Sequence, residues 1–218
     1  MGNEFDRRGF KGCLEKGAAG IGHPLTPEQA ELMTGHALEL AAWNKKINLT
    51  AIRDPLEMAE KHFVDAVAVD RFLNGVSRVM DMGTGGGFPA IPVKILNPGI
   101  SFTMVDSVRK KVSFLNHVVR TLGLEDIRAL HGRVEDLAKD PGHSQGYDAV
   151  ISRGFANLEK FTDFALPMLK PGGIIYALKG SLDEITPELK ERFRVNHEHY
   201  CLPFEKSDRY LVTLKLIE

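Results

Sequence analysis

A glycine-rich turn at residues 81–87 contains the residue types and spacing best suited to hold a ligand. The stretch Asp81-Met82-Gly83-Thr84-Gly85-Gly86-Gly87 directly follows a short apolar run, and a helical pattern begins just after it. Glycine adopts left-handed backbone angles without steric cost and allows a ligand to approach the main chain closely. Because α/β proteins bind ligands at the carboxyl ends of parallel strands, this turn predicts a ligand site.

A carboxylate at Asp106 fits the same site. It ends the next apolar run, at 102–105. This is about 20 residues beyond the turn, the distance at which an acidic side chain accepts the ribose hydroxyls of a bound nucleotide. Neighbouring parallel strands end at one edge of a sheet, so Asp106 and the turn are expected to lie together. The pair predicts a ligand that contains a nucleoside.

The spacing within the turn is compatible with two such ligands. The string at 85–90 satisfies Gly-x-Gly-x-x-Ala, typical of dinucleotide sites, and the string at 81–87 satisfies acid-x-Gly-x-Gly-x-Gly, typical of S-adenosylmethionine sites. We favour S-adenosylmethionine, because a carboxylate at Asp81 repels a pyrophosphate but can hold an α-ammonium group. Pro89 also lacks the N–H that a phosphate would use at a helix start. A turn without a ligand is the remaining interpretation.

The elements that must position the turn alternate between strand and helix after residue 77. This alternation predicts an α/β fold with a parallel sheet covered on both faces, and a period-two pattern at 210–217 predicts an antiparallel closing pair with the stretch around 195–203. The strand candidates are 79–81, 102–105, 127–130, 149–151 and 174–178, and the helical patterns lie near 90–97, 108–122 and 157–169.

The residues before this region divide into two parts. Residues 1–25 are rich in glycine and lack clear periodicity, which predicts a loosely ordered arm. Thr26-Pro27-Glu28-Gln29 and Asp54-Pro55-Leu56-Glu57 both combine a capping residue with a proline at the first helical position. These signals predict a helical cap over 26–75, followed by a ligand-binding domain over 76–218.

Composition limits the classes of protein that fit. The chain has 218 residues, of which 43% are hydrophobic, enough for one α/β domain with a sizeable core. No apolar run approaches the ~20 residues of a membrane-spanning helix, and the N-terminus lacks the apolar core of a secretory signal. Two cysteines, Cys13 and Cys201, provide neither a disulfide framework nor a metal cluster. We therefore expect a cytoplasmic protein without a metal or a membrane partner.

The net charge of −1 argues weakly against non-specific binding of nucleic acid. It leaves room for a local basic surface, because lysines and arginines outnumber acids between 106 and 133. The densest run in that segment is Arg109-Lys110-Lys111, at the start of a predicted helix.

Several motifs together resemble the bacterial small-subunit (16S) ribosomal RNA guanine-N7 methyltransferases, also called the glucose-inhibited division protein B family. The resemblance runs from about 26 to 217. The matching stretches are 44–53 (Asn-Lys-Lys-Ile-Asn-Leu-Thr-Ala-Ile-Arg), 61–65 (Lys-His-Phe-Val-Asp), 81–92 around the glycine turn, Asp106-Ser107, 109–111 with Phe114-Leu115, 133–135 (Arg-Val-Glu), 152–156 (Ser-Arg-Gly-Phe-Ala) and Lys179-Gly180. Three positions depart from the family pattern, namely Ala66, Val134 and Gly154.

The resemblance implies a Rossmann-like class I methyltransferase with a seven-stranded, mostly parallel sheet and an N-terminal helical cap. It implies S-adenosylmethionine as cofactor and ribosomal RNA or the small ribosomal subunit as partner. Residues expected at the cofactor are Asp81, Gly83, Gly85, Gly87, Phe88, Asp106, Val134, Glu135 and Arg153. Arg153 is expected to be catalytic. Residues expected at the substrate are Asn48, Thr50, Arg53, His62, Arg109, Lys110, Lys111 and Lys179.

Missing motifs narrow the reaction. The stretch after the fourth strand reads Ile-Ser-Arg-Gly-Phe at 151–155, whereas enzymes that methylate exocyclic amines commonly carry Asp/Asn-Pro-Pro-Tyr there. Methylation of pyrimidine C5 needs a cysteine nucleophile, and neither cysteine lies in the expected loops. Guanine N7 has an exposed lone pair and no proton, so it needs no general base. The alternative functions are a small-molecule methyltransferase and, less favoured by the motifs, an NAD-dependent oxidoreductase.

Calorimetry with both cofactor classes tests the choice between them. We expect S-adenosylhomocysteine to bind and NAD to give no heat of binding, because the turn offers a carboxylate where a pyrophosphate would lie. Tight NAD binding without a response to S-adenosylhomocysteine contradicts the prediction.

Overall fold

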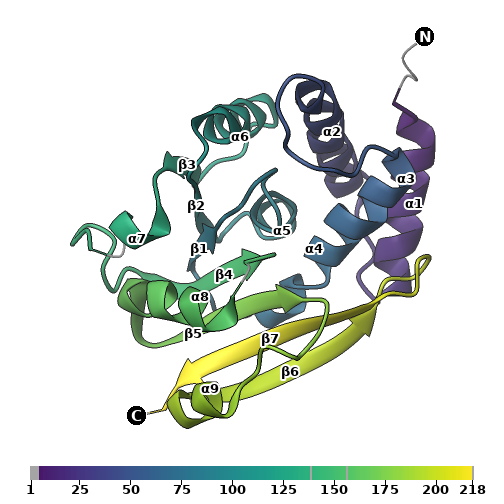
Figure 1. Cartoon of the computed structure of the whole chain (residues 1–218). Helices are drawn as coiled ribbons and strands as arrows, with labels where there is room; N and C mark the ends of the chain where they lie inside the picture. Colours follow the sequence, from purple (N-terminus) through teal and green to yellow (C-terminus); the bar gives the residue numbers. More distant parts are fainter. Residues whose placement is uncertain (1–4, 138, 156, 218) are drawn as a thin grey trace.

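The computed structural model describes residues 5–137, 139–155 and 157–217, and its centre is one seven-stranded sheet (Figure 1). The strand order is β3-β2-β1-β4-β5-β7-β6, and β7 alone runs antiparallel to its neighbours. The strands are β1 (Arg78–Met82), β2 (Ser101–Asp106), β3 (Ile127–His131), β4 (Tyr147–Arg153), β5 (Leu169–Lys179), β6 (Phe193–Cys201) and β7 (Asp208–Leu216). The predicted seven-stranded, mostly parallel sheet and its closing antiparallel pair are confirmed.

The short apolar runs become central strands because both of their faces are covered. In β1, Val79 packs into one hydrophobic cluster, whereas Met80 and Met82 pack into the cluster on the opposite face, and all three are fully buried. Side chains of a strand alternate between faces, so a continuous apolar run is what a strand between two helical layers needs.

Helices cover the two faces unequally. The helical segments are α1 (Arg7–Gly20), α2 (Pro27–Asn44), α3 (Pro55–Met58), the π-helical η1 (Ala59–Val64), α4 (Asp65–Val67), η2 (Asp70–Phe72), α5 (Ala90–Leu96), α6 (Arg109–Thr121), α7 (Val134–Leu137), α8 (Leu158–Ala165), η3 (Leu166–Met168) and α9 (Pro187–Arg192). The larger cluster joins buried residues of α1, α2, η1, α5 and α6 to one face of the sheet, and the smaller joins α8 and α9 to the other. Figure 1 shows α2, α4, α5 and α6 on one side of the strands and α8 and α9 on the other.

The two predicted helix starts are present as capping structures. Thr26 and Gln29 form a capping box at the start of α2, and Asp54 accepts hydrogen bonds from the backbone of Leu56 and Glu57 at the start of α3. The helices that follow share one hydrophobic cluster with the sheet. The predicted cap over 26–75 is therefore packed as a layer of the same core.

The expected loose arm at 1–25 is wrong for its described part, because α1 spans Arg7–Gly20. Asp6 caps the helix by accepting from Gly9 N, and Phe10 and Leu14 are fully buried on one face. Gly17 lies so close to Val64 that an added Cβ would be 2.6 Å from Val64 Cγ2. Glycine in this segment thus serves close packing of α1 against η1.

Sequence analysis also missed two short helices, α7 and α9, because four and six residues are too few to show a helical period. No helix in the described ranges is both long and apolar enough to cross a membrane.

Replacing Phe10 tests whether α1 belongs to the core. Phe10→Ala is expected to lower the free energy of unfolding by about 3–5 kcal/mol, because it empties a fully buried aromatic site. Urea denaturation gives the value, and Val108→Ala, at a side chain exposed to 44%, is the control that should change it little. Equal stability of Phe10→Ala and the natural protein would mean that α1 does not pack in solution.

Candidate cofactor and substrate site

The glycine turn is an open loop between β1 and α5. Gly83, Gly85 and Gly87 have φ angles of +73°, +58° and +91°, a region that side chains with a Cβ rarely occupy. Backbone N–H groups of Gly83 and Thr84 donate to the carbonyl of Val105 on β2, at 2.9 and 3.2 Å. The loop is thereby fixed to the neighbouring strand while the outer surface of Gly83 remains exposed.

Asp106 holds the loop from the end of β2. Its Oδ2 accepts from Gly85 N at 3.0 Å, and its Oδ1 accepts from Val108 N at 2.8 Å. A carboxylate has about four lone-pair sites, so both oxygens retain capacity for further donors. The residue is 6% exposed and lines a cavity beside the loop, and its contact with a ligand stays a prediction.

The cavity beside Asp106 has a volume of about 370 Å³. It has a polar edge, formed by Asp106 and Ser107, and an apolar side formed by Val105, Val134 and Phe155. Gly83, Gly132, Arg133 and Glu135 complete its lining. A flat base with a hydroxylated sugar matches such a mixed lining, since ligand sites are mostly apolar with a few placed polar groups.

A second cavity of about 140 Å³ also borders the loop. Gly83 lines both cavities, so a ligand that passes over this residue can occupy the two together. The second cavity is lined by Leu49, Thr50, His62, Gly83, Thr84, Gly85, Gly86, Phe88 and Arg153. The structure thus brings the predicted residues Thr50, His62, Phe88 and Arg153 to one place.

Arg153, at the end of β4, is held from three directions. Its Nη1 donates to the carbonyl of Lys61 at 3.0 Å and lies 3.5 Å from Asp65 Oδ2. Its guanidinium carbon lies 4.9 Å from the centre of the Phe88 ring. These contacts leave 21% of the side chain exposed, so Arg153 is fixed in orientation while still able to meet a substrate.

Asp65 is a supporting residue to which sequence analysis gave no role. The residue is 3% exposed, and its Oδ1 accepts from the hydroxyl of Tyr200 at 2.8 Å, with Arg209 Nε at 3.8 Å. An acid in an otherwise apolar helical stretch was the available signal, but its partners come from β4, β6 and β7. Asp65 therefore connects the C-terminal strands to Arg153.

His62 and Thr50 are joined across the second cavity. His62 Nε2 lies 2.7 Å from Thr50 Oγ1, and the imidazole stacks on Phe88 with ring centres 4.7 Å apart. Burial, with the charge of Arg153 nearby, lowers the pKa of His62 to about 3. Asn44 bonds to the backbone of Leu49 and Thr50 and so shapes this wall. His62 is neutral at neutral pH and is engaged with a hydroxyl.

His36 supports the loop from α2. Its Nε2–H donates to the carbonyl of Gly86 at 2.8 Å, and its ring stacks on Phe88 at 4.9 Å. The residue is fully buried, which lowers its pKa to about 4. Sequence analysis missed this contact because a single histidine in a helix gives no indication of a partner so distant in the chain.

Asp81 lies beneath the loop and lines neither cavity. It is fully buried, and its Oδ2 accepts from Thr84 Oγ1 at 2.7 Å and Ala90 N at 3.3 Å. Burial raises the pKa of this carboxyl to about 7. Its Oδ1 is buried and has no hydrogen-bond partner among the residues that the structure describes. Contact between Asp81 and a ligand's ammonium group stays a prediction.

The remaining predicted substrate residues lie outside the two cavities. Arg109 and Lys110 are exposed and Lys111 half-buried at the start of α6, while Asn48 and Arg53 are exposed in the 45–54 link. Lys179 is 9% exposed at the end of β5, where Nζ donates to Glu184 at 2.7 Å and to the carbonyl of Phe155 at 2.9 Å. Lys179 thus holds the backbone of Phe155 in the segment after β4, and its contact with RNA stays a prediction.

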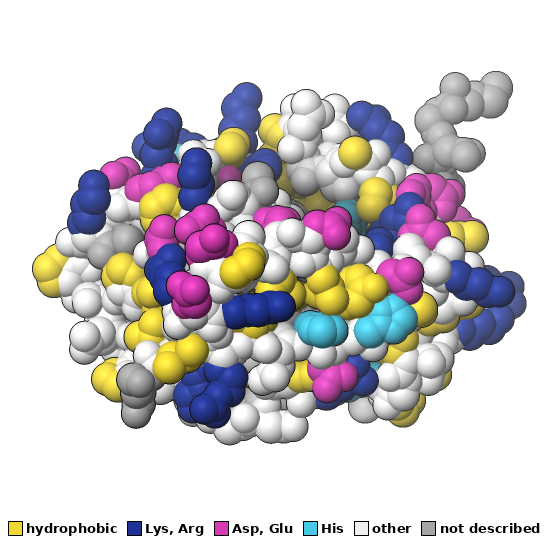
Figure 2. All heavy atoms as spheres, turned by 60° about the horizontal axis from the view of Figure 1, so that its bottom comes forward, with side chains coloured by type: hydrophobic (Ala, Val, Ile, Leu, Met, Phe, Trp, Pro, Cys, Tyr) yellow, Lys and Arg dark blue, Asp and Glu magenta, His cyan; other side chains and the backbone are white. Residues whose placement is uncertain are grey.

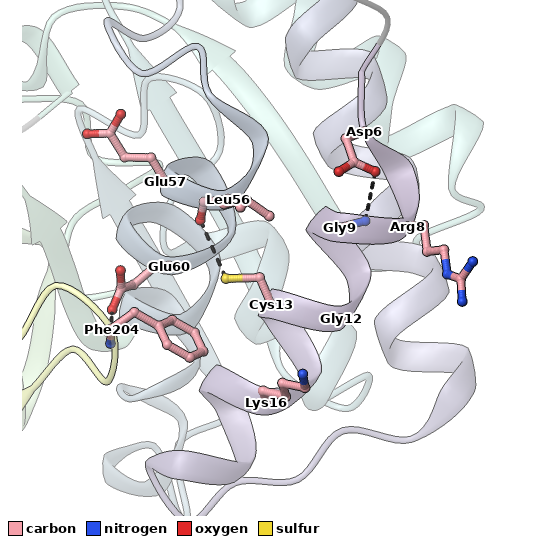
Figure 3. Close-up of a pocket in the computed structure, with 10 residues that line it drawn as sticks. All are labelled: Asp6, Arg8, Gly9, Gly12, Cys13, Lys16, Leu56, Glu57, Glu60 and Phe204. Carbon is pink, nitrogen blue, oxygen red and sulfur yellow. Dashed lines mark hydrogen bonds between the residues drawn. The ribbon is translucent and has the colours of Figure 1, made fainter.

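A hollow larger than these two cavities lies elsewhere. It has a volume of about 700 Å³ between α1 and the α3–η1 segment (Figure 3). The Glu60 carboxylate beside it accepts from the backbone N–H groups of Phe204 and Glu205, at 2.6 and 2.9 Å. The Glu60 carboxylate thus holds the β6–β7 turn against this hollow.

Comparison with solved structures gives the class of fold. An O-methyltransferase from Bacillus cereus in complex with S-adenosylhomocysteine aligns with 93% of this chain and 96% of its own, with a TM-score of 0.61 and 14% identity. An O-methyltransferase of tomaymycin synthesis from Streptomyces achromogenes, in complex with S-adenosylmethionine, aligns with 98% and 100%, also with a TM-score of 0.61 and 14% identity. The chain has the Rossmann-like methyltransferase fold.

The particular family follows from sequence. The family described as rRNA small subunit methyltransferase G matches residues 29–211. A ribosomal RNA small subunit methyltransferase G from Geobacter metallireducens is 43% identical over 217 residues, covering 94% of this chain and 95% of its own. One from Geotalea uraniireducens is 38% identical over 219 residues, covering 95% and 97%. The chain belongs to this family, as its motifs predicted.

The buried histidines predict a loss of stability in mild acid. In the unfolded chain, His36 becomes protonated as the pH falls below its ordinary pKa of 6.5. In the folded protein its pKa is about 4, so it stays neutral between these two pH values. The free energy of unfolding should fall as pH drops from 6.5 towards 4, by up to about 1.4 kcal/mol per pH unit for each such histidine.

Urea unfolding at a series of pH values measures this slope. His36→Gln keeps a donor for Gly86 and should reduce the slope, whereas His197→Gln, at an exposed histidine, should leave it unchanged. An identical slope in the natural protein and His36→Gln would show that His36 is not buried neutral.

Proposed function

We propose that this protein transfers a methyl group from S-adenosylmethionine to N7 of a guanine in small-subunit (16S) ribosomal RNA. The observation that carries the proposal is the pair of cavities that meet at Gly83, with Asp106 on one side and Arg153 on the other. Membership of the rRNA small subunit methyltransferase G family supports the RNA substrate. Action on ribosomal RNA would place the protein in the bacterial cytoplasm.

The residues around the larger cavity fit the cofactor. A Cβ added at Gly83 would meet its nearest neighbour, Phe155, only at 4.0 Å, so the main chain there is open to a ligand. Asp106 would accept from the ribose hydroxyls, while Val134 and Glu135 would flank the adenine. When bound, S-adenosylmethionine supplies a methyl group on a sulfonium sulfur, which is already a strong electrophile.

The protein's own contribution is alignment. Guanine N7 carries no proton, so no residue needs to act as a base, and the neutral His62 beside Thr50 is consistent with this. Arg153 would donate to the O6 and N7 edge of guanine or to a phosphate, as arginine does in nucleic-acid recognition. Its contacts with Lys61 and Asp65 fix its direction before substrate arrives. Holding reactants in line accounts for much of the acceleration of such a displacement.

Contacts with the rest of the RNA would come from the rim of the site. Arg109 and Lys110 are exposed directly after the cofactor carboxylate at Asp106, and Arg53 is exposed on the link that carries Thr50. Lysine and arginine that neutralise phosphates bind nucleic acid with strong salt dependence. We therefore propose these side chains as contacts to the RNA backbone, with Arg109 and Lys110 close in the chain to the lining of the larger cavity and Arg53 close to that of the second.

Two substitutions separate cofactor binding from methyl transfer. Asp106→Ala should weaken binding of S-adenosylhomocysteine by at least about tenfold, the loss of one charge-assisted hydrogen bond. Arg153→Ala should retain that binding but lower kcat/KM for methyl transfer by about 100-fold, because misplacement of a reactant costs this much.

Calorimetry and transfer of labelled methyl to small-subunit RNA measure the two effects. Arg194→Ala, at an exposed arginine on β6, serves as the control and should match the natural protein in both. Methyl transfer by Arg153→Ala at the rate of the natural protein would show that Arg153 has no part in the reaction. Methyl transfer to small metabolites and not to RNA would contradict the proposed RNA substrate.

Mapping of modified bases in cells tests the nucleotide assignment. Small-subunit RNA from cells that lack this protein should lack N7-methylguanine at one position, and the gene supplied in trans should restore it. An unchanged modification pattern would refute the proposed reaction.

A further inference from the structure

Three metal-ligating side chains meet on the outer face of the β6–β7 hairpin, apart from the site described above. Cys201, the last residue of β6, is paired directly with Asp208, the first residue of β7. His199 lies two residues before Cys201 and therefore on the same face of the strand. All three side chains are exposed. Figure 2 shows histidine side chains gathered on the face of the molecule that carries this hairpin.

The donor atoms of these residues converge. His199 Nε2 lies 2.6 Å from Asp208 Oδ1 and 3.8 Å from Cys201 Sγ, and Cys201 Sγ lies 3.5 Å from Asp208 Oδ1. One nitrogen, one sulfur and one oxygen thus form a small triangle that opens to solvent.

This triangle cannot act as a nucleophilic triad. Such a triad requires that one imidazole nitrogen face the nucleophile while the other binds the carboxylate. Here the same atom, His199 Nε2, faces both Cys201 and Asp208. The arrangement lacks a proton path through the ring, so the cluster is not a second hydrolytic or transferase site.

The distances between the three donor atoms are close to those around a bound zinc ion. With zinc bond lengths of about 2.3 Å to sulfur and about 2.0 Å to nitrogen and oxygen, tetrahedral angles place the donors about 3.3–3.5 Å apart. The two distances that involve sulfur, 3.8 and 3.5 Å, are near this range already. The nitrogen–oxygen distance of 2.6 Å would have to open by a small rotation of two exposed side chains.

We propose that His199, Cys201 and Asp208 bind one divalent transition-metal ion of the zinc type, with the fourth position open to water. The mixture of imidazole, thiolate and carboxylate suits zinc and cobalt better than magnesium or calcium, which prefer oxygen alone. Coordination replaces the S–H bond of Cys201 by a metal–sulfur bond and releases the proton to solvent. The carboxylate and thiolate then balance both charges of the ion.

The surroundings are compatible with a cation. Arg209, the nearest arginine in sequence, pairs with Tyr200 across the strands and faces inward, where its Nε lies 3.8 Å from Asp65. Arg71 lines a cavity that His199 and Cys201 also line, but its guanidinium lies over the ring of the adjacent Phe72, 4.8 Å from the ring centre.

The position of the site suggests what the ion would do. The metal would join the end of β6 to the start of β7 on the outer face, while Tyr200, between two of the ligands, donates to Asp65 on the inner face. An ion bound only to the folded hairpin stabilises it by mass action. The bound ion would therefore stabilise β6 and β7, the strands whose side chains contact Asp65.

Titration of the full chain with Co²⁺ under reducing conditions tests the site, because a thiolate ligand gives a charge-transfer absorption in the near ultraviolet. We expect this band to saturate at one ion per chain, to be absent in Cys201→Ser and to persist in Cys13→Ser, the matched control at the chain's other cysteine. His199→Ala and Asp208→Ala should weaken metal binding by at least about 10–100-fold. Loss of a residue that only hydrogen-bonds to a metal ligand already lowers the affinity by this factor.

A second readout uses Zn²⁺ and thermal unfolding. Zn²⁺ should raise the Tm of the natural protein and of Cys13→Ser, and should leave that of Cys201→Ser unchanged. Absence of the cobalt band in the natural protein, or its persistence in Cys201→Ser, would overturn the proposal. All ligands are exposed, so urea unfolding of each metal-free variant should match that of the natural protein and exclude misfolding as the cause.

Discussion

The hydrogen bond between Gly85 N and Asp106 Oδ2 is the interaction on which the rest of the site depends. It joins the loop after β1 to the end of β2, and it directs the carboxylate into the cavity beside Gly83. The backbone bonds from Gly83 and Thr84 to Val105 reinforce the same junction. A loop held in this way by the neighbouring strand presents its outer main chain to a ligand without having to order on binding, which lowers the entropic cost of association.

A second constraint connects the N-terminal helices to this loop. His36 on α2 donates to the carbonyl of Gly86, and the carbonyl of Lys61 on η1 accepts from Arg153 on β4. Phe88 lies among the rings of His36 and His62, with the guanidinium of Arg153 nearby. The helices are therefore part of the wall of the second cavity, which explains why they share one hydrophobic cluster with the sheet.

Burial controls charge throughout this region. His36 and His62 are kept neutral because burial disfavours their protonated forms, and the pKa of Asp81 is raised to about 7 for the same reason. Arg153 retains a carboxylate partner in Asp65, which Tyr200 and Arg209 also contact. The site thus presents one oriented cation and few competing charges, an arrangement suited to positioning an electron-rich base next to a cationic methyl donor.

The sequence by itself determined the strands, the helices α2, α5, α6 and α8, and the glycine turn, because their signals are local. Apolar runs of strand length, capping residues such as Thr26 and Asp54, and the glycine spacing at 83–87 each depend on residues close in the chain. The family motifs also predicted Arg153 and His62 as site residues, and the structure brings both to the lining of one cavity. The arm at 1–25 was misjudged because its helix is specified by packing of Phe10 and close approach at Gly17, and glycine is a poor helix former in isolation.

Only the tertiary structure decided the contacts between distant segments. The partners of Asp65 lie on three different strands, the contact between His36 and Gly86 spans 50 residues, and Cys201 meets Asp208 only because β6 pairs with β7. Such pairings follow from strand register and from the burial of polar groups that must find a partner, and neither is encoded in the spacing of neighbouring residues.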